Sequence, residues 1–360
     1  MRKIIIIFLS IFLTLISITL FANKKDSIIF LSYYVNYKTG YVIDFEPWFY
    51  AYNAKYNQSD TSNDFVIEAQ NGEAWSFSKS FLTNESYAVN DIRFIIDGLC
   101  KMFPTMTQEQ IKPVAQTFID YGRIPEKTEP DMPDMLAYLQ PHPQNKNFLQ
   151  AFTFFKSGNK GVIIQSMVLA TKEASDQLAS IMYKFRFLST KEYSINENSY
   201  KHNYFKFQFT TSNDYVIIPQ SRGFDRFFML SSIYSPLDSV KPLFATIYKV
   251  QVDETLPAEE QIQDIAEAHI SNTQKGQIQN YFNMLLSIIK KPQIIKTNYG
   301  KSNGLRAIYA VSGFNQLGIV YDLIKVGNNY ILIVVQIKNI DSKEINNYVN
   351  EFTKGLKVEI

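Results

Sequence analysis

The sequence predicts an α+β fold of two similar domains, each an antiparallel sheet with helices packed on it, after an N-terminal signal segment. Three observations predict it: a duplicated β-hairpin, a matching apolar helix stripe after each hairpin, and runs of strands without strict strand–helix alternation. With 360 residues, of which 46% are hydrophobic, the chain exceeds the size at which one core keeps growing. This length favours two domains.

The duplicated hairpin occupies residues 152–168 and 321–337. Each copy reads as a strand, a tight turn with Gly-Asn, and a second, strongly apolar strand. Gly158-Asn159 and Gly327-Asn328 stand 169 residues apart, and such pairs tolerate the positive φ that hairpin turns require. The two segments therefore predict equivalent hairpins.

Each hairpin is followed by a segment with helical spacing, 175–187 in the first half and 342–356 in the second. Apolar residues at spacings of four and three share one helix face. The stripes consist of Leu178, Met182 and Phe185, and of Ile345, Val349 and Phe352. We interpret them as buried packing faces, which makes an internal repeat the better explanation of the pattern.

The other elements follow from the same periodicities. In the first half, alternation over 75–82 predicts a strand, and spacing over 87–102 predicts a helix. The second half is expected to contain a strand at 244–252, helices at 258–270 and 277–289, and strands at 305–311, 318–325 and 330–337.

The expected organisation starts with a signal peptide, or an uncleaved anchor, at 1–22. A first α+β domain at 23–188 precedes a polar linker at 189–203 and a second α+β domain at 204–360. A Pro-rich insertion is expected near 125–143, because five prolines in that stretch preclude a helix or an inner strand.

The first 22 residues have the pattern of an export signal. Arg2 and Lys3 precede an apolar run over 4–21, and Ala22 is a small residue at a cleavage position. The run is also just long enough to span a bilayer, so an anchor remains the alternative. We expect an exported protein that is periplasmic or secreted and that contacts a membrane only through this segment. If the segment is not cleaved, it anchors the protein in the inner membrane.

The charge balance argues against a nucleic-acid-binding protein, and the cysteine content excludes a protein stabilised by an intramolecular disulfide. Without Arg2 and Lys3 the chain carries 34 basic and 34 acidic residues, and a neutral protein has no electrostatic reason to bind nucleic acid. Cys100 is the only cysteine, so no intramolecular disulfide is possible, and its apolar surroundings predict a buried, inert thiol.

The second half resembles the PsbP-like superfamily. The resemblance lies in the order of a strand at 204–209, the segment 215–219, the strand–Thr255-Leu-Pro–helix segment and the closing hairpin and helix, which ends at 347–352. The first half fits only at its two ends, because 106–150 departs from the pattern. The resemblance implies an antiparallel sheet with packed helices and a protein-binding or scaffolding role. The superfamily shares no catalytic residues, so none is carried over.

No pattern in the sequence identifies a reaction. His142, His202 and His269 each lack a second ligand at metal-binding spacing, and no Gly-x-Ser-x-Gly elbow occurs. The segment 300–304 lacks the length of a phosphate-binding loop and reads as a hairpin turn. We therefore predict no catalytic, cofactor-binding or metal-ligating residue, and no cofactor.

Two segments are candidate partner-binding surfaces. The first is the Pro-rich insertion, whose apolar contacts would be Met132, Met135 and Leu136; the alternative is a solvated surface loop. The second is the aromatic-rich start of the first half, represented by Tyr41, Trp48 and Phe49; the alternative is an ordinary aromatic core.

These features favour a non-enzymatic envelope protein that binds another envelope or secreted protein or assists its assembly. Two other classes stay open. One is an exported hydrolase with a site of scattered Ser, Asp and His residues. The other is a carrier of an apolar ligand or lipid, which the high aromatic content suggests.

Overall fold

The computed structural model describes residues 27–30, 33–37, 39–44, 65–68, 74–80, 92–125, 133–158, 160–196, 198–211, 215–234, 243–273, 292–299, 302–311, 317–338 and 343–358. The chain divides into two compact units after Phe185, with 123–134 and 156–159 grouped with the second unit. The signal segment expected at 1–22 and the helix expected at 277–289 lie outside the described residues. Within the described ranges, no helix is long and apolar enough to cross a membrane.

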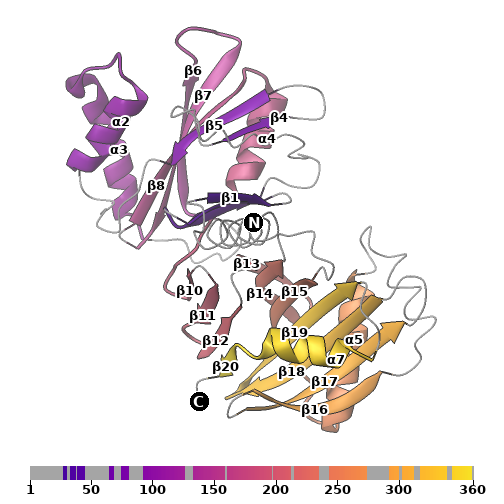
Figure 1. The fold of residues 1–360 in the computed structure, drawn as a ribbon. Coiled ribbons are helices and arrows are strands. Elements are labelled where there is room, and N and C mark those ends of the chain that lie inside the picture. The colour runs from indigo at the N-terminus through magenta and orange to yellow at the C-terminus, as the bar shows by residue number, and fades with distance from the viewer. Residues whose placement is uncertain are drawn as a thin grey trace, which may run out of the picture. The chain divides into compact units, whose positions relative to one another are not determined.

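The first unit is built on antiparallel sheets (Figure 1). A four-stranded sheet has the order β1-β2-β3-β9, and a five-stranded sheet the order β4-β5-β8-β7-β6. The strands are β1 (Ser27–Phe30), β2 (Tyr33–Asn36), β3 (Tyr41–Asp44), β4 (Phe65–Glu68), β5 (Ala74–Ser80), β6 (Met135–Pro141), β7 (Phe148–Ser157) and β8 (Lys160–Leu169), together with β9 (Arg186–Phe187), which comes directly after the division at Phe185. The helices are α2 (Ile92–Met102), α3 (Gln108–Arg123) and α4 (Lys172–Met182).

Strand β7 is the centre of the first unit's core. Its residues 150–156 are all buried, so side chains on both faces of the strand are covered. Phe152 packs on Phe103 at 4.3 Å between ring centroids, and Phe155 stacks on Phe185 at 3.7 Å. A strand enclosed on both faces reads as a continuous apolar run, as this one does.

The second unit repeats this plan. A four-stranded sheet has the order β10-β11-β12-β20, and a seven-stranded sheet the order β13-β14-β15-β19-β18-β17-β16. The strands are β10 (Tyr193–Asn196), β11 (Ser199–His202), β12 (Phe207–Thr210), β13 (Val216–Phe224), β14 (Phe227–Tyr234), β15 (Leu243–Val250), β16 (Gln293–Tyr299), β17 (Ser302–Val311), β18 (Leu317–Val326), β19 (Asn329–Lys338) and β20 (Leu356–Val358). The helices are α5 (Ala258–Thr273) and α7 (Ile345–Thr353).

Helices cover both faces of the seven-stranded sheet (Figure 1). On one face, Ile262 and Ala266 of α5 join a buried cluster with Tyr309 and Tyr321 of the sheet. On the other face α7 lies so close that a Cβ added at Gly318 would be 2.6 Å from Cδ1 of Ile345. Alternate residues of β17 and β18 therefore face α5 and α7 in turn.

The α+β class is confirmed, and the repeat extends to strand register. Strands β7 and β8 have their counterparts, β18 and β19, displaced by 169 residues at both ends. The turn glycines Gly158 and Gly327 have φ values of 59° and 58°. Ala137 opposite Thr153 in the first half corresponds to Arg306 opposite Asp322 in the second. Both halves also close with a short strand after the last helix, β9 or β20.

One strand of the second unit has no counterpart among the described residues of the first half. In the second unit β16 pairs with β17 along its full length. The first-half counterpart of β17 is β6, which pairs with β7 and ends the five-stranded sheet. Among the described residues, the outer side of β6 therefore carries no strand.

The structure corrects three expectations. Residues 189–203, predicted as a linker, contain β10 and β11, and β11 pairs with β12 of the second unit. The Pro-rich stretch 125–143 contains β6, an edge strand that tolerates a terminal proline. The helix expected at 175–187 ends at Met182, because Phe185 leaves the helix to stack on Phe155 in the core.

Candidate functional site

The structure divides the predicted partner-binding residues into three groups. Met132, Trp48 and Phe49 lie outside the described residues. Met135 and Leu136 lie on β6 and are half-buried. Tyr41 is fully buried, with its ring 5.2 Å from that of Phe185, so it is a core residue and not part of a binding face.

Strand β6 presents an apolar, uncharged edge. Tyr138 is 43% exposed and its neighbour Leu139 is 46% exposed, and the strand Met-Leu-Ala-Tyr-Leu-Gln-Pro has no charged side chain. Edge strands of soluble proteins normally carry a charge, most often a lysine, that discourages pairing with other chains. The edge strand β16 of the second unit has such an exposed lysine, Lys296. The β6 edge lacks this protection.

The hydrogen bonds at both ends of β6 indicate which backbone groups face outward. The amide of Lys156 donates to the carbonyl of Asp134 at 3.3 Å, and the amide of His142 donates to the carbonyl of Phe148 at 2.9 Å. Antiparallel pairs alternate between bonded and non-bonded positions, so even-numbered residues between them bond to β7. Met135, Ala137 and Leu139 therefore direct their N–H and C=O groups away from β7.

Pro141 fits this assignment. It is an odd-numbered residue, so its missing N–H would face the outer edge, where no bond within the sheet is lost. A proline at an even-numbered position would instead interrupt the pairing with β7. The edge of β6 thus offers a row of backbone donors and acceptors flanked by Tyr138 and Leu139.

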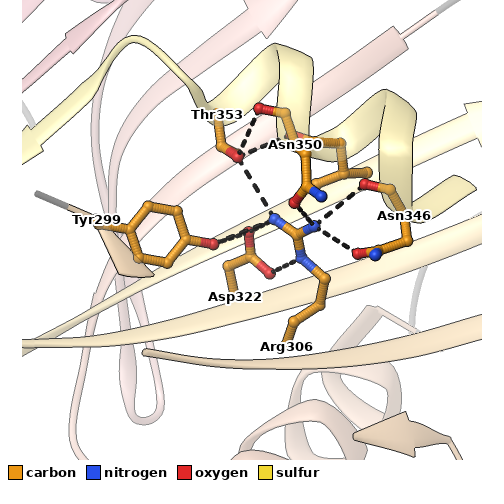
Figure 2. A network of polar contacts seen from close by, with 7 residues as sticks. Tyr299, Arg306, Asp322, Asn346, Asn350 and Thr353 are labelled. Atoms are coloured by element: carbon orange, nitrogen blue, oxygen red, sulfur yellow. Dashed lines mark hydrogen bonds and ion pairs between the residues drawn. The ribbon is translucent and has the colours of Figure 1, made fainter. Parts of the chain in front are cut away.

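The second candidate is a buried polar network beneath α7 (Figure 2). Arg306 of β17 lies directly opposite Asp322 of β18. Its Nε donates to Oδ1 of Asp322 at 2.6 Å, and its Nη2 to Oδ2 at 2.7 Å. Tyr299 donates its hydroxyl to the same carboxylate. This is a bidentate pair with a third donor, which is the strongest geometry for a carboxylate and a guanidinium.

Helix α7 completes the network. Nη1 of Arg306 donates to Oδ1 of Asn346 at 2.8 Å and to Oδ1 of Asn350 at 2.6 Å. Thr353 accepts from Nη2 at 3.4 Å and donates to the Val349 carbonyl at 2.7 Å. Asn346, Asn350 and Thr353 are four and three residues apart, so their side chains share the helix face that covers the sheet.

The surroundings of Arg306 keep its guanidinium charged. Burial by itself would lower the pKa of Arg306, but the hydrogen bonds and charge of Asp322 raise it above its usual value. Burial and the charge of Asp322 raise the pKa of the Tyr299 hydroxyl, which therefore remains a donor. Arg306 and Asp322 are both 0% exposed, whereas Asn346 is half-buried and Asn350 is exposed, so the ion pair is enclosed and its partners on α7 lie at the rim of the network.

The network is suited to holding α7 on the sheet. Its charges are paired with each other, and a solute has no surface at which to meet them. The first half has Ala137 and Thr153 at the equivalent positions, so the shared fold does not require the pair. Sequence reasoning missed it, although one signal was available: Arg306 and Asp322 are charged residues of opposite sign that interrupt two apolar strands.

Two histidines are buried in the second unit. His269 lies in α5, with its ring nitrogens 3.3 Å and 3.1 Å from the hydroxyls of Tyr321 and Tyr248. Burial lowers the pKa of His269 to about 4. His202, expected in a linker, stacks on Phe205, and burial together with the charge of Lys249 lowers its pKa to about 4.

Because His202 and His269 have lowered pKa values in the folded protein, we expect its free energy of unfolding to fall in mild acid. In the unfolded chain each imidazole has its usual pKa of 6.5, so below that pH the unfolded state binds more protons than the folded state. The free energy of unfolding should therefore fall as the pH drops from 6.5 towards 4, by at most about 1.4 kcal/mol per pH unit for each histidine. Urea denaturation at pH 7.5, 6.0 and 5.0 measures the slope.

The matched variant for this prediction is His269→Gln, which keeps a donor and an acceptor beside the two tyrosines. Its stability at pH 7.5 will be lower, but its slope between pH 6 and 5 should be about half that of the parent chain. An unchanged slope would show that His269 is already protonated in the folded protein.

Three further expectations concern a metal site, the single cysteine and the segment 300–304. Across the residues that the structure describes, no three or more His, Cys, Asp and Glu side chains are grouped so as to hold a metal ion. Cys100, expected as a buried thiol, is half-buried on α2. Of the segment 300–304, predicted as a hairpin turn, residues 302–304 lie in β17, where Ser302 pairs with Tyr299 of β16, and residues 300–301 lie outside the described residues.

Comparisons with known proteins give only distant likenesses. No family model matches the chain, and no curated protein matches it. Among solved structures, a cyanobacterial PsbP from Synechocystis sp. PCC 6803 is 7% identical, with a TM-score of 0.30, over 46% of this chain and 95% of that one. LpqN of Mycobacterium tuberculosis, described as involved in cell envelope biogenesis, is 11% identical, with a TM-score of 0.25, over 43% and 83%.

A third solved structure is the type VI secretion immunity protein TplEi of Pseudomonas aeruginosa. It is 8% identical, with a TM-score of 0.26, over 93% of this chain and 98% of that one. At these TM-scores the likenesses carry no weight in the functional argument. The β6 edge is therefore assessed on its own geometry.

Proposed function

We infer that the chain is a non-enzymatic envelope protein that binds another protein through the β6 edge of its first unit. The observation that carries this proposal is the pairing of two features at one place. Tyr138 and Leu139 are exposed and apolar, and the outward backbone groups of β6 have no strand beside them among the described residues. Unshielded sheet edges of this kind bind extended segments of partner proteins.

The Arg306–Asp322 network and the site of His269 are explained by the fold. Arg306 and Asp322 bond to each other and to α7, and His269 lies between two tyrosine hydroxyls. Each group is buried and has a structural partner. A catalytic role would require contact with a substrate, which these enclosed positions do not provide.

Export is the second part of the proposal. It rests on the sequence of the first 22 residues, where two cations precede an apolar run. An exported partner protein is the corresponding expectation.

Site-specific photocrosslinking in living cells tests this function. We expect p-benzoylphenylalanine at position 138 of the full-length chain to crosslink one defined envelope protein. The matched control is the same substitution at Tyr183, which is 40% exposed on the C-terminal side of α4. Mass spectrometry identifies the product. Equal crosslinking at both positions, or none at position 138, would contradict the proposal.

A further inference from the structure

We propose that the β6 edge receives an extended segment of its partner as an added antiparallel strand, in the register that β16 adopts on β17. The proposal rests on the protein-binding function above and specifies what binds and how. It follows from the internal repeat, because the second half contains a strand, β16, that has no counterpart among the described residues of the first half.

The repeat aligns the two edges residue by residue. Ala137 faces Thr153 as Arg306 faces Asp322, so β6 and β17 correspond at a displacement of 169 residues. In the second unit Ile295 of β16 lies opposite Arg306. A strand added to β6 in the same way would place its equivalent residue opposite Ala137.

The hydrogen-bonding groups correspond as well. Gln293, Ile295 and Thr297 lie opposite Ile308, Arg306 and Gly304 in the β16–β17 ladder. The first-half equivalents of these β17 residues are Leu139, Ala137 and Met135, whose N–H and C=O groups point outward. An added strand would therefore form alternating pairs of backbone hydrogen bonds with these three residues.

The chemistry of the edge specifies the segment. No residue of β6 is charged, and at the end of the strand Lys156 lies 3.5 Å from Asp134, so these two charges compensate each other. A charged residue placed against Tyr138 and Leu139 would lose hydration without gaining a counter-ion. The matching segment is uncharged at those positions, as β16 is with Gln293, Ile294 and Ile295.

A peptide with the β16 sequence, Gln-Ile-Ile-Lys-Thr-Asn-Tyr, is the probe. We expect its fluorescein-labelled form to bind the full-length chain, purified in mild detergent, with saturable anisotropy below about 100 μM. The variant Leu139→Pro removes one outward N–H and should weaken binding at least about tenfold. The control Leu139→Ala keeps that N–H and should weaken binding less than about threefold.

Two measurements separate this result from misfolding. Circular dichroism must show the same thermal transition for Leu139→Pro and Leu139→Ala, because residue 139 makes no backbone bond to β7. The parent chain should also fail to bind the peptide N-methylated at the position of Ile295, which leaves the protein unchanged.

Three outcomes would overturn the inference. These are absence of peptide binding, equal binding by Leu139→Pro and Leu139→Ala, and a dimer lost in Leu139→Pro, which would make a second copy of the chain the occupant. A partner crosslinked at position 138 whose binding is unaffected by Leu139→Pro would retain the proposed function and reject strand addition.

Discussion

Replacing Asp322 with alanine is expected to lower the free energy of unfolding by about 3–5 kcal/mol, because the charge of Arg306 would remain buried without its counter-ion. Both side chains are 0% exposed, and the guanidinium cannot reach water from beneath α7. The Tyr299 hydroxyl would lose its acceptor at the same time. Chemical denaturation followed by circular dichroism measures the loss.

The control removes both charges. Arg306→Met with Asp322→Thr introduces at 322 the residue found at the equivalent first-half position, Thr153, and retains an unbranched apolar side chain at 306. Well-packed neutral replacements of buried ion pairs are often nearly neutral. We expect the double variant to recover at least half of the loss caused by Asp322→Ala.

One outcome would contradict the role of charge compensation. If the double variant is as unstable as Asp322→Ala, the stability derives from packing at these positions and not from the compensation of charge. Raising the salt concentration should leave the difference between the variants unchanged, because a pair closed to solvent is screened very little.

Replacing Gly355 with alanine is expected to cost about 3 kcal/mol, the upper end for an added methyl group that has no space. A Cβ at this position would lie 1.8 Å from the carbonyl oxygen of Thr210, which is a backbone atom and cannot rotate away. The Gly355 carbonyl accepts from the Thr210 amide at 3.1 Å, so relief of the clash would separate β20 from β12.

Gly223→Ala is the matched control for this effect. A Cβ at Gly223 would have its nearest contacts at 3.5 Å and 3.8 Å, which are ordinary van der Waals distances. Its stability should therefore stay within about 1 kcal/mol of the parent chain. Similar losses for the two glycine variants would indicate a general intolerance of strand glycines and would reject the clash at Thr210.

The edge proposed to bind a partner is only partly predictable from the sequence. Met135 and Leu136 were identified as apolar residues in a Pro-rich stretch, but this stretch read as a loop because prolines mask a strand pattern. Tyr138 and Leu139, which are more exposed, were not identified. Tyr41 was placed on a binding face because the composition of an aromatic strand does not reveal which neighbours cover it.

The sequence by itself determined the features that depend on neighbouring residues. Alternation and helical spacing established the α+β class, and the Gly-Asn pairs identified both hairpins, because turn geometry and side-chain periodicity are local properties. Only the tertiary structure decided which strands lie side by side and which edge stays open. It also brought Arg306 to Asp322 and to Asn350, which is 44 residues away along the chain. Such contacts join distant segments, and their energy depends on burial, which no local pattern contains.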